Sequence, residues 1–324
     1  MCGLIYCKRH KSDKSVAGMI EKRFRNQKER GTQGFGYVEI KNGIVTGEIR
    51  TQTEKEMLEH LTASTAEEIL FHHRIPTSTP NFIESTHPIK VSHKSLKYNY
   101  YVIHNGIINN DNKLKEKHTK QGFSYNTEIK KKWITTQQTY IETLFNDSES
   151  LAIDFCLSLE KKKSMESEGS IAFIALQYEK TTGKAINLFF GRNGGNPLCI
   201  ESNKEFLAIS SESGKEIETD TLYQYNYETT EITSRDYDIG ISDYSYKQIG
   251  YNTNNYNKQF NWYDYEEDDI LSEYDDEIDY LKGQLKLAIE MRDYNEIMSI
   301  ESQIEELQIM RREDEQKLQL QCNF

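Results

Sequence analysis

The chain has 324 residues and a formal net charge of −12, with 28% charged and 36% hydrophobic residues. No window approaches the roughly 18 consecutive apolar residues of a membrane span, and the polar N-terminus lacks a hydrophobic signal segment. We therefore expect a cytoplasmic protein, in the host cytoplasm if a phage encodes it. Residues 236–324 hold 22 Asp and Glu against 8 Lys and Arg, and no basic stripe indicates nucleic-acid binding.

Short segments rich in β-branched and aromatic residues predict strands over the first 235 residues. These strands cover residues 34–40, 43–50, 68–75, 100–108, 170–178, 185–192, 197–201 and 206–211. Helical periodicity predicts helices over residues 14–31, 54–64 and 149–161. Strand pairs joined by short turns, such as EIKNGIV, favour antiparallel sheets with helices packed outside. This is an α+β layered domain over residues 2–235.

The remaining chain is different in composition. Residues 236–269 are rich in Tyr, Asn, Asp and Ser, which predicts an acidic spacer. From 270 to 320, apolar residues recur at helical spacing on both sides of RDYN, which predicts a helical hairpin or coiled coil. Within it, LKLAIEMRDYNEIMSIESQIEEL weakly resembles the helical hairpin of nucleotide-excision-repair proteins, and a generic coiled-coil hairpin is the alternative. Either way we expect an association element.

The five cysteines form no CxxC pair and no zinc-type spacing, so we expect neither a structural disulfide nor a metal site. Cys7, Cys156 and Cys199 are predicted core residues. Cys2 is different because it directly follows Met1. If Met1 stays, Cys2 is an ordinary thiol near the chain end. If Met1 is removed, Cys2 carries a nucleophilic thiol and a free α-amine that can act as a base.

Two strand ends offer groups for binding and catalysis. FHHRIPTST places Arg74 and Thr77 together, a guanidinium and a hydroxyl suited to a carboxylate, although a surface ion pair is the alternative. In VIHNGIINN, Asn105 and Gly106 offer an amide donor and an unhindered backbone N–H, as an oxyanion hole requires. Asn-Gly is also a strong hairpin-turn signal, so a simple turn remains open there.

Two further stretches have local structural interpretations. RGTQGFGY is a glycine-rich turn that leads into a strand, and no helix follows it to bind phosphate. In FNDSESLAIDF, the sequence Asp147-Ser148-Glu149 resembles a helix N-cap.

Taken in order behind Cys2, these stretches resemble the glutaminase domain of class II glutamine amidotransferases, members of the N-terminal-nucleophile hydrolases. The matching pieces are the MCG start, the RGxxxxG turn, the HxR..T strand end, HPI at 87–89, HNG and D[ST]E. Later, GRNGGNPLCI and LAISSES are similar to the R-x-x-x-x-PL and S[ST]E segments of the family. The resemblance covers about residues 2–235 and implies a four-layer αββα sandwich of two antiparallel sheets.

The resemblance also implies a reaction without a cofactor. Cys2, freed of Met1, attacks the side-chain amide of L-glutamine, and its own α-amine serves as the base through a water molecule. Asn105 and Gly106 hold the oxyanion. The thioester on Cys2 is hydrolysed to glutamate, and ammonia leaves for an acceptor.

The same resemblance implies a clamp for the amino-acid part of the substrate. Arg74, helped by Thr77, binds the α-carboxylate, and Asp147 binds the α-ammonium. His87 and His104 are candidate supporting residues.

Several positions depart from the family pattern. Gln33 stands where Asp is usual, and His73 and Ile75 replace a Thr and an aromatic residue around the arginine, which puts the usual loop closure over glutamine in doubt. An insertion around YNTEIKKKWITTQQT lengthens the gap before Asp147. Asn126 lies nearer but cannot offset an ammonium charge, so Asp147 is the preferred residue.

No synthase motif follows the glutaminase-like region. We therefore expect a separate glutaminase subunit whose hairpin, residues 270–320, docks an acceptor synthetase or a second copy of the chain. One alternative is a catalytically drifted scaffold that acts through its hairpin. Others are an amidase for a different amide and an ammonia donor in nucleoside or nucleic-acid modification.

Overall fold

The computed structural model describes residues 2–11, 14–76, 79, 81–134, 139–240 and 308, with the backbone alone over 131–134 and 139–142. The chain divides into two units, Met1–Tyr251 and Asn252–Phe324, and the architecture below is that of the first. Most of the predicted spacer and, apart from Gln308, the predicted hairpin at 270–320 lie outside the described residues. No helix of the described part is long and apolar enough to cross a membrane.

The first large sheet contains the N-terminal strand near its centre. Its order is β13-β11-β12-β1-β4-β2-β3, and neighbouring strands run antiparallel. The strands are β1 (Gly3–Arg9), β2 (Gly34–Lys41), β3 (Ile44–Thr51), β4 (Glu68–Arg74), β11 (Cys199–Ser202), β12 (Phe206–Ser210) and β13 (Lys215–Glu216). Because β1 pairs with both β12 and β4, Cys2, the residue just before it, is held at the end of a central strand.

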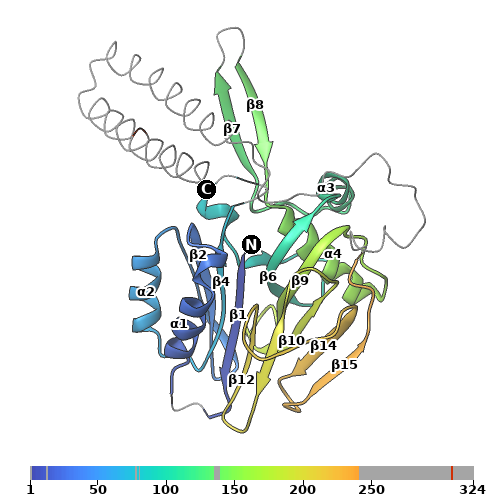
Figure 1. Ribbon diagram of the computed structural model, residues 1–324. Helices are drawn as coiled ribbons and strands as arrows, with labels where there is room; N and C mark the ends of the chain where they lie inside the picture. Colours follow the sequence, from blue (N-terminus) through green and yellow to red (C-terminus); the bar gives the residue numbers. More distant parts are fainter. Residues whose placement is uncertain are drawn as a thin grey trace, which may run out of the picture. The chain divides into compact units, whose positions relative to one another are not determined.

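The second large sheet has the order β15-β14-β10-β9-β6-β5 and is also antiparallel. Its strands are β5 (Ile89–Val91), β6 (Asn99–Ile108), β9 (Gly169–Tyr178), β10 (Ala185–Arg192), β14 (Thr221–Asn226) and β15 (Ile232–Asp236). The predicted insertion forms a separate two-stranded sheet of β7 (Ile129–Ile134) and β8 (Thr139–Leu144), which Figure 1 shows extending from the sandwich.

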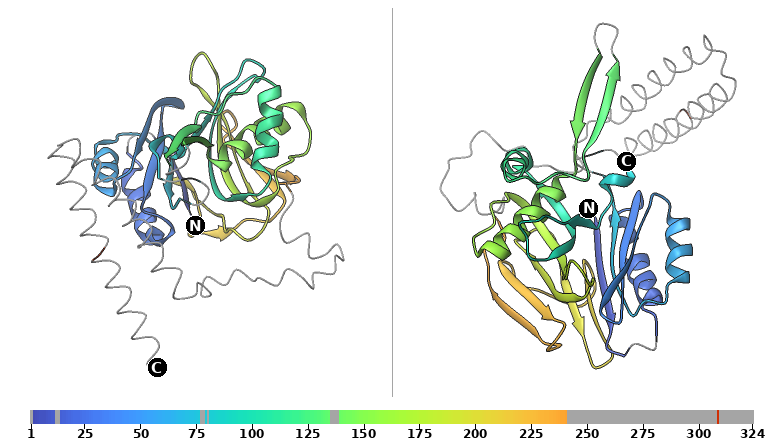
Figure 2. Two further views of the ribbon diagram at one scale, coloured as in Figure 1. Left: turned by 90° about the horizontal axis from the view of Figure 1, so that it is seen from above. Right: turned by 180° about the vertical axis from the view of Figure 1, so that it is seen from behind.

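Helices cover the outer faces of both sheets (Figures 1 and 2). The helices α1 (Ala17–Asn26) and α2 (Glu54–Ala63) pack on the first sheet, whereas α4 (Asp147–Lys161) packs on the second and contacts α3 (Asp111–Lys120). Short 3-10 turns occupy Lys28–Arg30 and Ile83–Ser85. The predicted α+β, four-layer αββα sandwich is thus confirmed.

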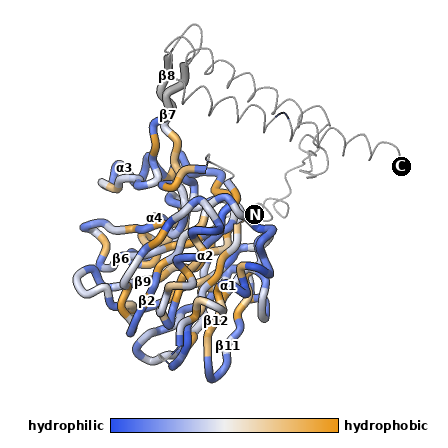
Figure 3. Tube along the Cα trace, turned by 90° about the vertical axis from the view of Figure 1, so that its left-hand side faces the viewer, coloured by the Kyte–Doolittle hydropathy of each residue, from blue (hydrophilic) through white to orange (hydrophobic). Residues whose placement is uncertain are grey.

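The apolar residues of the described part fill the spaces between these layers. One cluster, including Phe24 and Phe71, lies between the first sheet and its helices, and another, including Phe155, lies under α4. A third, including Leu4 and Leu70, lies between the two sheets. In Figure 3, hydrophobic residues follow the strands and helices, and the connecting loops are largely hydrophilic. Burial of these apolar surfaces is what drives the layers together.

The three cysteines that were predicted to lie in the core are buried. Cys7 and Cys156 are fully buried in β1 and α4, and Cys199 in β11 is buried as well.

Candidate active site

The register of β1 with β4 brings the N-terminus and Arg74 to the same face of the first sheet. Leu4 lies opposite His72, and both Leu4 and Leu70 pack in the cluster between the sheets. Because side chains alternate along a strand, His72 and Arg74 share this inner face. Cys2 comes two residues before Leu4, at the end of the strand where Arg74 lies.

The second sheet contributes Asn105 from the opposite side. Ile103 of β6 packs in the cluster between the sheets, so Asn105, two residues on, also points inward. The Asn105 Oδ1 atom accepts a hydrogen bond of 2.9 Å from the backbone nitrogen of Cys2. Its Nδ2 atom is buried and has no hydrogen-bond partner in the described structure. Asn105 therefore anchors Cys2 with one end and presents an unused donor with the other.

The Asn105-Gly106 pair does not form a hairpin turn. The sequence placed it at a strand end, but β6 continues to Ile108 and both residues stay paired with β9. Gly106 has a φ of 145°, and a Cβ there would lie 1.7 Å from the Ser170 carbonyl oxygen. The glycine is needed because the backbone conformation and the close approach of β9 both exclude a side chain. The turn alternative is thereby excluded.

Arg74 is almost fully buried and holds a loop in place. Its Nη1 donates to Ser85 Oγ at 2.5 Å, and its Nη2 donates to Thr79 at 2.6 Å to Oγ1 and 3.2 Å to the carbonyl oxygen. Thr77, which the sequence paired with Arg74, lies outside the described residues. Thr79 and Ser85 are contacts that the sequence reasoning missed.

Asp147 ties α4 to β6. It is the first residue of α4 and almost fully buried, and its Oδ2 accepts from the Ile108 backbone nitrogen at 2.9 Å. The sequence suggested Asp147 itself as the start of an N-cap. The cap is instead Asn146, whose Oδ1 accepts from the Ser148 nitrogen at 3.0 Å. The Asp147 Oδ1 atom also accepts from the Ser148 nitrogen, at 2.9 Å, so the carboxylate joins the start of α4 to β6.

The charges of Arg74 and Asp147 both act on the Cys2 thiol. Burial raises the pKa of this thiol above its ordinary value, and the nearby Asp147 carboxylate adds to the rise. A hydrogen bond to the Ile75 carbonyl oxygen, 3.6 Å from Sγ, and the Arg74 guanidinium act in the opposite direction on the pKa. The Cys2 thiol, which is the predicted nucleophile, is thus close enough to the Arg74 guanidinium and the Asp147 carboxylate for both charges to act on it.

His104 connects three elements beside this site. Its Nδ1 lies 2.9 Å from Ser148 Oγ in α4, and its Nε2 lies 3.3 Å from the Ser170 carbonyl oxygen in β9. His87 is also buried, and its ring lies tilted against that of His72 with 4.1 Å between the centroids. These are the positions of the two candidate supporting histidines.

Two of the residues that depart from the family pattern do not enter the site. Gln33 is exposed, and its backbone nitrogen donates to the Arg74 carbonyl oxygen. His73 lies on the outer face of β4, where its Nδ1 donates to the Gly31 carbonyl oxygen at 2.8 Å and its ring packs against Phe24. Ile75 contributes its carbonyl oxygen to the Cys2 thiol. The side chain of His73 therefore has no place over a substrate.

The later motifs also meet around the site. Asn196, from GRNGGNPLCI, donates to the Asn105 carbonyl oxygen at 3.1 Å and to Ser170 Oγ at 2.5 Å. Directly after β12, Ser211 Oγ accepts from the Leu4 nitrogen of β1 at 3.1 Å. The S[ST]E segment includes Ser211, so the motif match could have identified it. Asn196 falls at a variable position of R-x-x-x-x-PL, and only the fold shows that it contacts Asn105.

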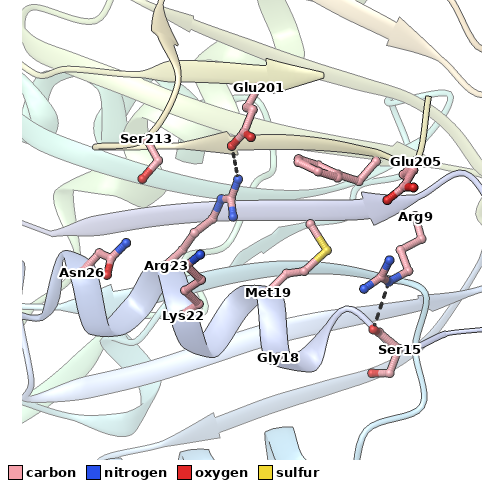
Figure 4. Close-up of a pocket in the computed structure, with 11 residues that line it drawn as sticks. Arg9, Ser15, Gly18, Met19, Lys22, Arg23, Asn26, Glu201, Glu205 and Ser213 are labelled. Atoms are coloured by element: carbon pink, nitrogen blue, oxygen red, sulfur yellow. Dashed lines mark hydrogen bonds and ion pairs between the residues drawn. The ribbon is translucent and has the colours of Figure 1, made fainter. Parts of the chain in front are cut away.

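A separate pocket on the outer face of the first sheet contains none of these residues (Figure 4). It lies between α1 and the strands β11 and β12. The Arg23 side chain of α1 crosses it and pairs with Glu201 at 2.5 Å. Among the described residues, no cluster of His, Cys, Asp or Glu could hold a metal ion.

Comparison with solved structures identifies the same fold in known enzymes. The chain is similar to glutamine phosphoribosylpyrophosphate amidotransferase from B. subtilis complexed with ADP and GMP, with a TM-score of 0.52 and 18% identity over 74% of this chain and 50% of that one. It is also similar to an allosteric regulatory enzyme of purine biosynthesis, with a TM-score of 0.53 and 17% identity over the same shares. The chain thus spans about half the length of these relatives and shares their fold.

No protein-family model matches the chain, and no curated protein matches it by sequence.

Proposed function

We propose that the protein is a glutaminase subunit that hydrolyses the side-chain amide of L-glutamine through a thioester on Cys2 and delivers ammonia to a partner synthetase. The observation that carries this proposal is the contact of Cys2 with Asn105. The backbone nitrogen that would become the α-amine after loss of Met1 is already bound to Asn105 Oδ1, and the unused Asn105 Nδ2 lies buried beside it.

The chemistry follows from this arrangement. With Met1 removed, the α-amine of Cys2, whose ordinary pKa is about 8, takes the thiol proton, directly or through a water molecule. The thiolate attacks the amide carbon, and Asn105 Nδ2 with the Gly106 N–H stabilises the oxyanion. Collapse of the tetrahedral intermediate breaks the C–N bond, and the leaving nitrogen receives the proton held by the amine. Water then cleaves the thioester to glutamate and restores the thiol.

The charges around Cys2 favour an amino acid as substrate. Arg74 and Asp147 both act on the Cys2 thiol electrostatically, so a cation and an anion lie near the nucleophile. In our proposal Arg74 binds the α-carboxylate and Asp147 the α-ammonium of glutamine. Both are held by contacts with Ser85 and Ile108 that fix them before substrate arrives, which favours binding because little order must be gained. The shared fold with glutamine amidotransferases supports the same assignment.

The experiment is an assay of ammonia release from L-glutamine by the full chain. We expect release by the wild type, no detectable release by Cys2→Ala, and a strongly raised KM in Asp147→Asn because the ammonium partner loses its charge. The matched control is Cys199→Ala, which removes a buried thiol outside the site and should leave kcat unchanged. Equal rates for wild type and Cys2→Ala, or no release by a wild-type sample shown to lack Met1, would contradict the proposal.

The acceptor enzyme is the second part of the proposal. The segment 270–320, with its helical apolar spacing, is the candidate docking element for a synthetase or a second copy of the chain.

A further inference from the structure

Two histidine rings lie against each other inside the sandwich, next to the proposed site. His72 of β4 is fully buried and His87 is 2% exposed, and their ring centroids are 4.1 Å apart. His87 reaches this position because β2 has a glycine beneath it, since a Cβ at Gly36 would lie 2.0 Å from the His87 carbonyl oxygen. The glycine-rich turn and strand thus make room for what we call the His72–His87 pair.

The hydrogen bonds of this pair are incomplete within the described structure. His72 Nε2 lies 3.2 Å from the His104 carbonyl oxygen and must donate to it, which leaves Nδ1 as a bare acceptor without a partner. Neither ring nitrogen of His87 has a partner. A buried polar atom left unpaired is costly, so three such atoms side by side indicate that something polar binds there.

The surroundings keep both rings neutral. Burial lowers the pKa of His72 and of His87 well below the usual value, and the groups that face His87 are basic: His72, His104, Arg74 and Arg50. A neutral imidazole has one N–H donor and one acceptor nitrogen, which matches the hydrogen-bonding capacity of water.

The pair lies between Arg74 of the proposed site and Arg50, which lines a surface cavity, since both arginines act on the pKa of His87. On one side, His72 shares the inner face of β4 with Arg74, two residues away. On the other side, Arg50 donates to the carbonyl oxygen of Pro88, the neighbour of His87, at 2.7 Å. Arg50 also lines a cavity of about 310 Å³ together with Asn126 and Thr127.

We propose that the His72–His87 pair binds ordered water between the sheets and that this hydrated pair conducts a proton from the active site to the cavity at Arg50. The inference rests on the proposed function. Glutamine and water give the glutamate carboxylate, ammonia and one proton. If ammonia leaves uncharged for an acceptor, that proton must leave separately. His72 keeps its N–H on the His104 carbonyl oxygen and orders the water through its bare Nδ1. The proton is relayed at His87, whose ring accepts a proton at one nitrogen as it releases the proton at the other, so that no charged imidazolium accumulates.

The test compares His87→Phe with His118→Phe. The His87→Phe variant keeps an aromatic ring against His72 but has no ring nitrogen. We expect kcat to fall about ten- to hundred-fold with KM unchanged, and the solvent isotope effect on kcat to rise, because proton transfer becomes limiting. His118 is equally buried but bonds Tyr125 through Nδ1 at 2.9 Å, so His118→Phe should lower stability and leave kcat unchanged.

Stability and rescue distinguish a proton path from a packing role. The free energy of unfolding of His87→Phe should equal or exceed that of the wild type, since the variant replaces unpaired polar atoms with an apolar ring. In His87→Ala, added imidazole should restore part of kcat. An unchanged kcat in His87→Phe of an active enzyme, or a loss explained by unfolding, would overturn the proton path. A crystal structure that shows no ordered water at either ring would overturn the hydration site, even if the protein does not hydrolyse glutamine.

Discussion

Asn105 is the residue on which the proposed chemistry depends most directly. Its Oδ1 holds the backbone nitrogen of Cys2, so its amide plane is fixed by the residue that it assists. The opposite Nδ2 donor is then set in place before any substrate binds. Donors fixed in this way stabilise a developing oxyanion because no reorganisation is needed during the reaction.

The first prediction tests this donor. Asn105→Asp keeps an oxygen for the Cys2 nitrogen but replaces the Nδ2 donor with an acceptor. We expect kcat for glutamine hydrolysis to fall about 10²- to 10³-fold, with a smaller change in KM. Asn99, in the same strand β6, is the matched control, and Asn99→Asp should reduce kcat much less. Equal losses in the two variants would contradict the oxyanion role.

The second prediction concerns His73 and acidic pH. Burial lowers the pKa of His73 to about 4, and its neutral ring donates to the Gly31 carbonyl oxygen and lies 3.0 Å from Gln27 Nε2. The unfolded chain therefore binds a proton that the folded one does not, between a pKa of about 6.5 and about 4. The free energy of unfolding is therefore unaffected by His73 above pH 6.5. It decreases as the pH falls towards 4, by about 3 kcal/mol, because the folded state does not take up the proton that the unfolded chain binds.

Chemical denaturation at a series of pH values measures this loss. In His73→Gln, the free energy of unfolding should depend less on pH between 6.5 and 4. Superimposable pH profiles for the two proteins would contradict the assignment.

The residue types of the site could largely be predicted from the sequence, but the contacts that hold these residues could not. Arg74, Asn105 and Asp147 were identified from short motifs. The motifs could not reveal that Thr79 and Ser85 hold Arg74, because those bonds depend on the loop after β4. They also left His73 ambiguous, since only the pairing of β4 shows that it faces α1 and not the site.

At the scale of elements, the start of α4 organises one side of the site. Asn146 caps the helix through Oδ1, and its Nδ2 donates to the Ser85 carbonyl oxygen at 2.6 Å. Ser85 in turn accepts from Arg74. One capping residue therefore links the helix that carries Asp147 with the loop that positions Arg74.

The third prediction follows from that link. Asn146→Ala should lower the free energy of unfolding by about 1–2 kcal/mol, through loss of the cap, and should raise KM for glutamine more than it lowers kcat. Thr53, the N-cap of α2, is the control, because it accepts from Glu56 in a helix on the outer face of the first sheet. Thr53→Ala should destabilise the protein by a similar amount without a change in KM. Equal KM changes would show that the link is only structural.

Eight strands of the described part could be predicted from the sequence, because their β-branched and aromatic residues are dense and bounded by turns. Seven were not predicted: β1, β5, β7, β8, β13, β14 and β15. The strand β1 was not predicted, although it carries Cys2 into the sheet. Its sequence GLIYCKR is short and ends in two basic residues, and its assignment depends on the pairing with β4 and β12. Helix α3 was missed because its sequence DNKLKEKHTK offers Leu114 as its one aliphatic residue.

For the molecule as a whole, the site depends on both sheets. The first sheet supplies Cys2 and Arg74, and the second supplies Asn105, with Asp147 from the helix that covers it. No local segment contains the site, so the order of motifs in the chain could indicate which residues meet, but only the packing of the sheets brings them into contact.

The fourth prediction separates catalysis from association. A chain that ends at Tyr251, the boundary of the first unit, should release ammonia from glutamine at the rate of the full chain. The same truncation should abolish recovery of an acceptor synthetase, or of a second copy of the chain, in a pull-down. Unchanged partner recovery after removal of residues 252–324 would contradict a docking role for the segment 270–320.

The central claim is that Cys2 becomes the N-terminal residue and acts as the nucleophile. Intact-mass measurement of the purified protein, before and after treatment with an electrophilic glutamine analogue, tests it most directly. We predict that the protein lacks Met1 and gains one adduct, located on Cys2 by peptide mapping, and that excess glutamine prevents the labelling. A protein that retains Met1 and gains no adduct on Cys2 would contradict the account.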